Sequence, residues 1–121
     1  MKEIVMELPE YVLAAYEAAK SRKAQECIIY DVSETSGYTD YVMIAHGNST
    51  RQAVSISDEI QRALVDMKIK PIGSEGRNNG DWILTDFGNL VVHIMLSESR
   101  LYYQLDSIWR DNPSFGDEIS E

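Results

Sequence analysis

The stretch YVMIAHGNSTRQ, residues 41–52, contains the change of pattern that decides the fold. Its first half, residues 41–46, is a nearly continuous apolar run, as expected of a β-strand that is covered on both faces. Ser49 and Gln52 then form a capping-box signal, in which two side chains satisfy backbone N–H groups at a helix N-terminus. These residues predict a buried strand followed directly by a helix, as in an α/β domain.

Three helices are predicted from apolar side chains at helical spacing. The first spans residues 8–22 and has Pro9 in its first turn. The second continues to about Met67, and the third spans residues 97–109, ahead of Asn112-Pro113. The side chains expected to form their buried faces are Leu8, Val12, Ala15 and Ala19 in the first, Ala53, Ile56, Ile60, Leu64 and Met67 in the second, and Leu101, Leu105 and Ile108 in the third.

Five strands are predicted around these helices. They are residues 26–32, residues 41–46, a short edge strand beginning at Pro71-Ile72-Gly73, residues 82–86 and residues 89–96. The last two strands meet at Phe87-Gly88-Asn89 and are expected to form an antiparallel hairpin. The order α-β-β-α-β-β-β-α predicts an α/β fold, a five-stranded mixed sheet flanked by helices. It forms a single domain over residues 1–112, and residues 113–121 are expected to be a frayed acidic C-terminal tail.

The charge of the chain favours some partners over others. The chain contains eleven Lys and Arg residues and twenty Asp and Glu residues, which gives a net charge of −9. This chain lacks the basic surplus on which sequence-independent nucleic-acid binding relies, whereas a basic protein partner would be attracted. Acidity that only confers solubility remains the alternative. No apolar run approaches the roughly 20 residues of a membrane span, and the N-terminus does not resemble a signal peptide. We therefore expect a cytoplasmic protein that binds no membrane.

Candidate catalytic chemistry is sparse. Gly47-Asn48-Ser49 precedes a helix, where backbone N–H groups can hold an anion, but the phosphate-binding glycine motifs are absent. Metal-dependent nucleotidyl transfer needs converging carboxylates, and Asp81 and Asp86 are five residues apart, which places them on opposite faces of a strand. His46, His93 and Cys27 lack metal-ligand spacing. We expect no catalytic residue, no metal and no cofactor, hence not an enzyme.

An aromatic and charged set surrounds the predicted hairpin and last helix. Its members are of the types that dominate protein–protein contacts, and they are equally suited to a core. Composition alone leaves these two roles open. The set comprises Trp82, Phe87, Arg100, Tyr102, Tyr103 and Trp109.

In order and spacing, several segments are similar to the Iojap or ribosomal silencing factor (RsfS) family. The similarity covers residues 8–110, and His46 and Asn48 depart from the usual pattern. The resemblance implies a mixed sheet that is distantly nucleotidyltransferase-like, without transferase chemistry. The segments are residues 39–52, Glu75-Gly76, residues 82–86 with Gly88, residues 91–93, and residues 100–105 leading to Trp109.

The resemblance also implies a role. Such a protein binds the basic protein numbered fourteen of the large ribosomal subunit, blocks joining of the small subunit and represses translation, and is a homodimer. Carried over to this chain, the partner-binding residues would be Trp82 as apolar anchor with Ile83 beside it, Asp86 paired with a basic partner residue, and Arg51, Arg100 and Tyr103 around them. Each could instead be structural. No sequence-specific nucleic-acid contact is expected. The alternative function is a small nucleotide-binding or nucleotidyltransferase-like enzyme that uses the turn at Gly47–Ser49.

Overall fold

The unit at residues 41–52 folds as its pattern predicts in the computed structural model, which describes residues 7–117. Strand β2 spans Tyr41–Gly47, and helix α2 spans Thr50–Asp66 with Ser49 as its N-cap. The backbone N–H of Gln52 donates to Ser49 Oγ over 3.1 Å. Gln52 Oε1 in turn accepts from the Asn48 N–H at 2.7 Å, one residue earlier than in the standard capping box.

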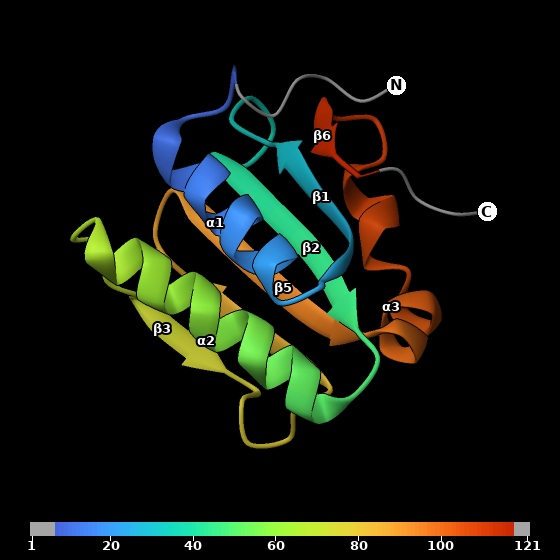
Figure 1. The fold of residues 1–121 in the computed structure, drawn as a ribbon. Coiled ribbons are helices and arrows are strands. Elements are labelled where there is room, and N and C mark those ends of the chain that lie inside the picture. The colour runs from blue at the N-terminus through green and yellow to red at the C-terminus, as the bar shows by residue number, and fades with distance from the viewer. Residues whose placement is uncertain (1–6, 118–121) are drawn as a thin grey trace.

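The remaining elements agree with most of the predicted boundaries (Figure 1). The structure adds a short 3₁₀ helix, η2, and a sixth strand, β6, to the elements expected. The other elements are α1 (Glu10–Ser21), β1 (Gln25–Asp31), β3 (Gly73–Glu75), β4 (Trp82–Asp86), β5 (Leu90–Leu96), α3 (Ser97–Tyr103), η2 (Leu105–Trp109) and β6 (Ser114–Gly116).

The six strands form one mixed sheet in the order β3-β4-β5-β2-β1-β6. The central pair, β2 and β5, is parallel, and every other neighbouring pair is antiparallel. The predicted hairpin is confirmed, because Phe87 N–H donates to the Leu90 carbonyl at its turn. The predicted count of five strands is wrong, since β6 pairs with β1 through Ile28–Tyr30.

Strand β6 lies in the segment that the sequence assigned to a frayed tail. Ser114 pairs with Tyr30, and Asp117 N–H donates to the Cys27 carbonyl over 2.9 Å. The tail prediction is therefore wrong for residues 114–117, because the segment satisfies backbone groups that β1 would otherwise leave open. Residues 118–121, like residues 1–6, lie outside the described residues, so the ends of the predicted domain and tail stay untested.

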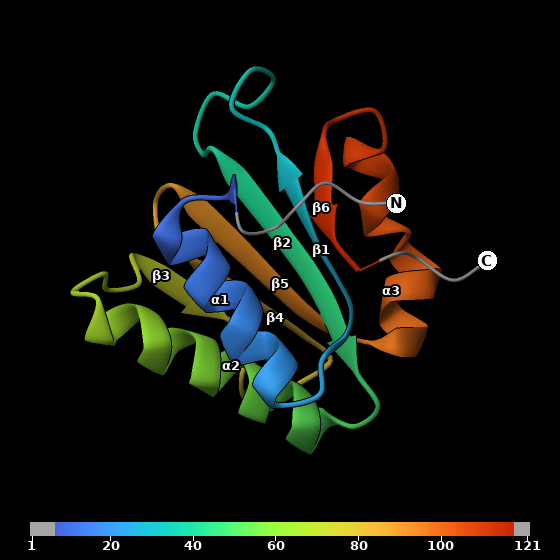
Figure 2. The same cartoon turned by 45° about the horizontal axis from the view of Figure 1, so that its top comes forward.

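Helices α1 and α2 cover one face of the sheet, and Figure 2 shows both in front of the strands. Alternate strand residues such as Ile29, Met43 and Ile94 pack against them and are fully buried. The predicted helical faces are confirmed for α1 and for α2 up to Leu64, while Met67 is half-buried. A smaller cluster, which includes Ile28, Tyr30, Ile44, Met95 and Leu105, lies on the other face.

The third helix is shorter than predicted. Gln104 adopts a left-handed conformation with φ of 50°, which ends α3 and starts η2 in a new direction. Leu105 is buried as a result, whereas Leu101 and Ile108 are exposed. The prediction that these three side chains share one buried face is wrong, because it assumed an unbroken helix.

Candidate functional site

Aromatic rings form a continuous row on the sheet face opposite α1 and α2. The row begins on β1, crosses β5 and β4, and ends on α3. Consecutive ring centroids are 4.9 to 6.2 Å apart, close enough for direct ring contact. We call it the aromatic row; its members in order are Tyr30, Trp109, His93, Trp82, Tyr103 and Tyr102.

One end of this row is open to solvent. Tyr103 is 56% exposed and Tyr102 is 79% exposed, and their rings meet edge to face. Leu101, also on α3, is 76% exposed, and Ile108 on the following η2 is 63% exposed. Large apolar side chains gathered on an exposed segment are typical of a protein–protein contact. We call these four residues the α3–η2 surface.

Trp82 connects the α3–η2 surface to the core. Its indole N–H donates to Nδ1 of His93 over 3.0 Å, and its ring contacts that of Tyr103 at 4.9 Å. Burial lowers the pKa of His93 to about 4, so the imidazole is neutral at pH 7 and Nδ1 can accept the hydrogen bond. The half-buried Trp82 ring is thus held in one orientation, as a binding anchor requires.

Arg100 has a structural role. It is buried, and its Nε and Nη2 atoms donate to the two carboxylate oxygens of Asp106 at 2.9 Å each. Its Nη1 donates to the Glu26 carbonyl at 2.7 Å and to Nδ1 of His46 at 3.0 Å. Tyr30 Oη also donates to Asp106, at 2.7 Å. Within the fold, the guanidinium fastens α3 and η2 to β1 and β2, and the partner-binding role expected for Arg100 stays a prediction.

Two other expected docking residues on β4 are also engaged within the fold. Ile83 is 1% exposed and packs toward α2, because neighbouring side chains of a strand point to opposite faces. Ile83 is thus a core residue of this chain, and its expected contact with a partner stays a prediction. Asp86 lies at the opposite end of β4 from Trp82, and its Oδ1 accepts from the Gly88 N–H at 2.8 Å. That carboxylate stabilises the turn of the hairpin.

Arg51 lies in the first turn of α2, which packs on the sheet face opposite the aromatic row. It borders an open hollow of about 360 Å³. Four other charged side chains line this hollow together with Val54 and Ser55; they are Arg22, Asp58, Glu59 and Arg62.

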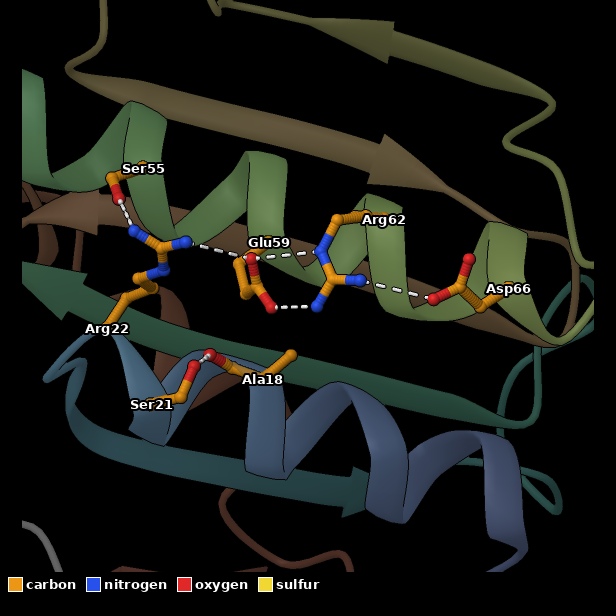
Figure 3. A network of polar contacts seen from close by, with 7 residues as sticks. All are labelled: Ala18, Ser21, Arg22, Ser55, Glu59, Arg62 and Asp66. Carbon is orange, nitrogen blue, oxygen red and sulfur yellow. Dashed lines mark hydrogen bonds and ion pairs between the residues drawn. The ribbon is translucent and has the colours of Figure 1, made fainter.

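The charges around this hollow are largely matched, as Figure 3 shows. Arg22 Nη2 donates to Glu59 at 3.1 Å, and Arg62 pairs with Glu59 and, at 3.1 Å, with Asp66. Hydrogen bonds from Arg62 and Arg22 lower the pKa of Glu59. The Arg22–Glu59 pair links the end of α1 to α2, whereas the two pairs of Arg62 lie within α2. Ion pairs whose arginines are exposed, as here, add little stability.

The turn at residues 47–49 uses its polar groups for local structure. Ser49 Oγ accepts from Gln52, and the Asn48 N–H donates to the Gln52 side chain. The Gln52 amide nitrogen then donates to the carbonyls of Arg22 and Lys23 at 3.2 and 3.1 Å. This turn therefore caps α2 and ties it to the end of α1.

The structure thus brings together Trp82 and Tyr103 from the expected docking set. Sequence reasoning missed Leu101 and Ile108 as surface residues, because both fit the apolar stripe of one continuous helix. The left-handed Gln104 ends that helix between them, and both side chains are exposed. The position of Ile83 carried a usable signal, namely the two-residue alternation of β4. Nothing in the pattern indicated that Arg100 is buried.

The fold and this surface define the class: a small α/β domain with exposed aromatic and aliphatic side chains on a short helical segment. Within residues 7–117, no three His, Cys, Asp or Glu side chains gather closely enough to hold a metal ion. Over the same residues, no helix has the length and apolarity to cross a membrane.

The chain belongs to the ribosomal silencing factor family: residues 5–121 match the family described as "Ribosomal silencing factor during starvation". It is 34% identical to the ribosomal silencing factor RsfS of Chromobacterium violaceum over 91% of both chains. The RsfS of Bacillus subtilis is 33% identical, with 79% of this chain and 81% of the relative covered. The chloroplastic Iojap protein of Zea mays is 26% identical over 82% of this chain, which spans 43% of that longer protein.

Solved structures agree with the family assignment. A crystal structure of a Chromobacterium violaceum protein superposes with a TM-score of 0.84 at 32% identity, covering 95% of this chain and 92% of that one. A crystal structure from Bacillus halodurans gives 0.78 at 29% identity, covering 89% and 98%. The resemblance seen in the sequence is confirmed, as is the mixed α/β fold. The bacterial relatives are named as silencing factors rather than as enzymes.

Proposed function

We propose that this chain silences translation by docking on the large ribosomal subunit. Its partner there is the basic protein numbered fourteen, and the docked factor occupies the surface that the small subunit needs for joining. The action is steric and takes place in the cytoplasm, without catalysis. Membership of the ribosomal silencing factor family supports the ribosomal part of this proposal.

The observation that carries the proposal is the exposed end of the aromatic row. The domain leaves apolar surface exposed at Leu101, Tyr102 and Tyr103. The ring of Tyr103 also packs against that of Trp82. Aromatic anchors that the fold already holds in place cost little entropy on binding. We therefore assign the centre of the contact to Trp82 and the α3–η2 surface.

Electrostatics favours a basic partner. The chain carries a net charge of −9, which steers a positively charged surface toward it at low salt. Asp86 and Arg51 lie away from the aromatic centre, at the end of β4 and in the first turn of α2. We propose them as peripheral contacts, where a charge tunes association rate more than affinity.

Sedimentation tests the proposal directly. Tagged full-length protein is mixed with separated large subunits, separated small subunits and intact ribosomes, and each mixture is run through a sucrose gradient. We expect recovery with free large subunits and none with intact ribosomes, where the docking surface is covered. Equal recovery from intact ribosomes would contradict the steric mechanism. The same protein alone, measured by light scattering, is expected to be a homodimer.

A further inference from the structure

Strand β1 is seven residues long and would form one edge of the sheet if the chain ended at Asn112. Cys27, Ile28 and Ile29 are fully buried, and Tyr30 is nearly so. A long apolar edge strand with unpaired backbone groups is a template for pairing with another chain. Such an edge needs a cover.

Strand β6 covers this edge, and it is itself too short to expose many unpaired backbone groups. It has three residues, follows Pro113 and ends at Gly116, where φ is +102°. A β-carbon at this glycine would stand 2.5 Å from the Cys27 carbonyl oxygen. The opposite edge strand, β3, also has three residues. Both edges of the sheet are thus closed by strands too short to recruit another chain.

Besides its ladder with β1, β6 is attached at its two ends. At one end, Asp31 N–H donates to the Pro113 carbonyl over 2.9 Å. At the other end, the Asp117 carboxylate accepts from Tyr16 Oη at 2.8 Å, from Cys27 N–H at 3.0 Å and from Lys20 Nζ. Because a side chain makes these last three bonds, one residue controls much of the contact.

From this arrangement we propose that β1 is a strand-accepting edge, which β6 keeps closed in cis, and that with β6 detached β1 pairs with β1 of a second copy of this chain. The present neighbour of β1 on this side runs antiparallel to it, so the edge accepts an antiparallel strand. Two β1 strands related by a two-fold axis are antiparallel, and each offers the other the same apolar residues. This inference does not depend on the proposed function.

The test uses the full chain with the substitution Gly116→Val. The valine side chain cannot fit against the Cys27 carbonyl, so β6 should leave β1. The matched control is Gly37→Val, because nothing lies within 4 Å of the β-carbon that it adds. Two quantities are measured: hydrogen exchange at the Asp31 amide, and mass by light scattering over a concentration series.

At low concentration we expect the Asp31 amide to exchange at least about tenfold faster in Gly116→Val than in the control. At high concentration the mass of Gly116→Val should be at least twice that of the control, because each copy gains one further two-fold contact. A peptide of residues 112–121 added in excess should return the mass to the control value, and a scrambled peptide should not.

Equal masses for the two variants, with the Asp31 amide unprotected in Gly116→Val, would overturn the proposal. If Gly116→Val does not fold, the same measurements are made on Asp117→Ala. This variant should also release β6, because it removes the carboxylate that accepts from three donors. Asp117→Ala must then show fast exchange at Asp31 at low concentration and a mass at least twice that of the control at high concentration. A folded Asp117→Ala variant with β6 still attached, or with unchanged mass, would equally overturn it.

Discussion

Trp82 and His93 form a hydrogen-bonded pair across β4 and β5, with the indole N–H 3.0 Å from Nδ1 of the imidazole. Trp82 has only this donor, so His93 must supply a lone pair at Nδ1 and carry its proton on Nε2. A charged imidazole would present N–H groups on both nitrogens and would break the contact. The orientation of the proposed anchor therefore depends on a neutral histidine.

Stability should accordingly fall on mild acidification. The pKa of His93 is about 4 in the folded protein, against an ordinary value of 6.5. Between these values the unfolded chain binds a proton that the folded chain does not, so the free energy of unfolding decreases as pH falls from 6.5 to 4. We expect a loss of about 3 kcal/mol over this range. Urea denaturation at half-unit pH steps measures it.

His93→Gln is the control for this pH dependence. A glutamine side-chain oxygen can accept from the Trp82 N–H but does not titrate. The variant should be less stable at pH 7 and should show a flatter profile between pH 6.5 and 4. Residual loss below pH 4 is expected in both proteins, because hydrogen bonds outweigh burial and lower the pKa of Asp106 and Asp117. Identical slopes in the two proteins would refute the assignment to His93.

Substitution of Trp82 should reduce both binding and stability. Trp82→Ala removes the contact with Tyr103 and leaves the His93 nitrogen without its donor, at a cost of about 3 kcal/mol in stability. Binding to the large-subunit protein should weaken by more than tenfold, about 2 kcal/mol. Trp82→Phe keeps an aromatic ring but loses the hydrogen bond and part of the indole's area, so comparison with Trp82→Ala separates the ring contact from the rest. Thermal melts and binding titrations on the same samples give both quantities.

Arg100→Ala should strongly destabilise the fold rather than only impair docking. The substitution leaves Asp106 as an uncompensated, partly buried charge, which typically costs 3–5 kcal/mol (about half of a small domain's stability). The exposed Arg110→Ala is the matched control, with an expected effect within about 0.5 kcal/mol. A stable Arg100→Ala variant that no longer binds the large subunit would support the partner-binding role expected from the sequence.

The α3–η2 surface predicts the opposite pattern. Replacing Leu101 and Tyr102 together with alanine should leave the melting temperature nearly unchanged, because both side chains are largely exposed. Affinity for the large subunit should fall at least about tenfold. Tyr38→Ala, at a tyrosine that is 70% exposed on the loop after β1, is the control and should bind normally. Normal binding by the Leu101/Tyr102 variant would place the docking surface elsewhere.

Most of the fold could be predicted because its signals are local. Apolar runs defined β1, β2 and β5, the Ser49–Gln52 cap located the start of α2, and the turn at residues 87–89 gave the hairpin. Strand β6 could not be predicted in this way. Its three residues carry no alternation, and it is held by Tyr16 and Lys20, about 100 residues earlier in the chain.

The candidate site was only partly predictable for a similar reason. A sequence pattern identifies residue types that bind partners, but it does not show whether their side chains are already engaged in contacts within the fold. The Arg100 side chain is paired with Asp106, six residues later. The Asp86 carboxylate accepts a hydrogen bond from Gly88 in the hairpin turn. Tyr103 remains exposed at the end of α3, where the left-handed backbone at Gln104 ends the helix, and its ring contacts that of Trp82.

The parallel pairing of β2 with β5 also has a kinetic consequence. Tyr41 lies opposite Leu90, about 50 residues later, whereas the neighbouring pairs β1–β2 and β4–β5 are joined by short connections. Closing the longer loop costs more entropy, so the two hairpins should form first and their docking should limit the folding rate. Substitutions at the β2–β5 contact, such as Val92→Ala, should then slow refolding in stopped-flow measurements. Changes on α3, which joins after that step, should instead accelerate unfolding.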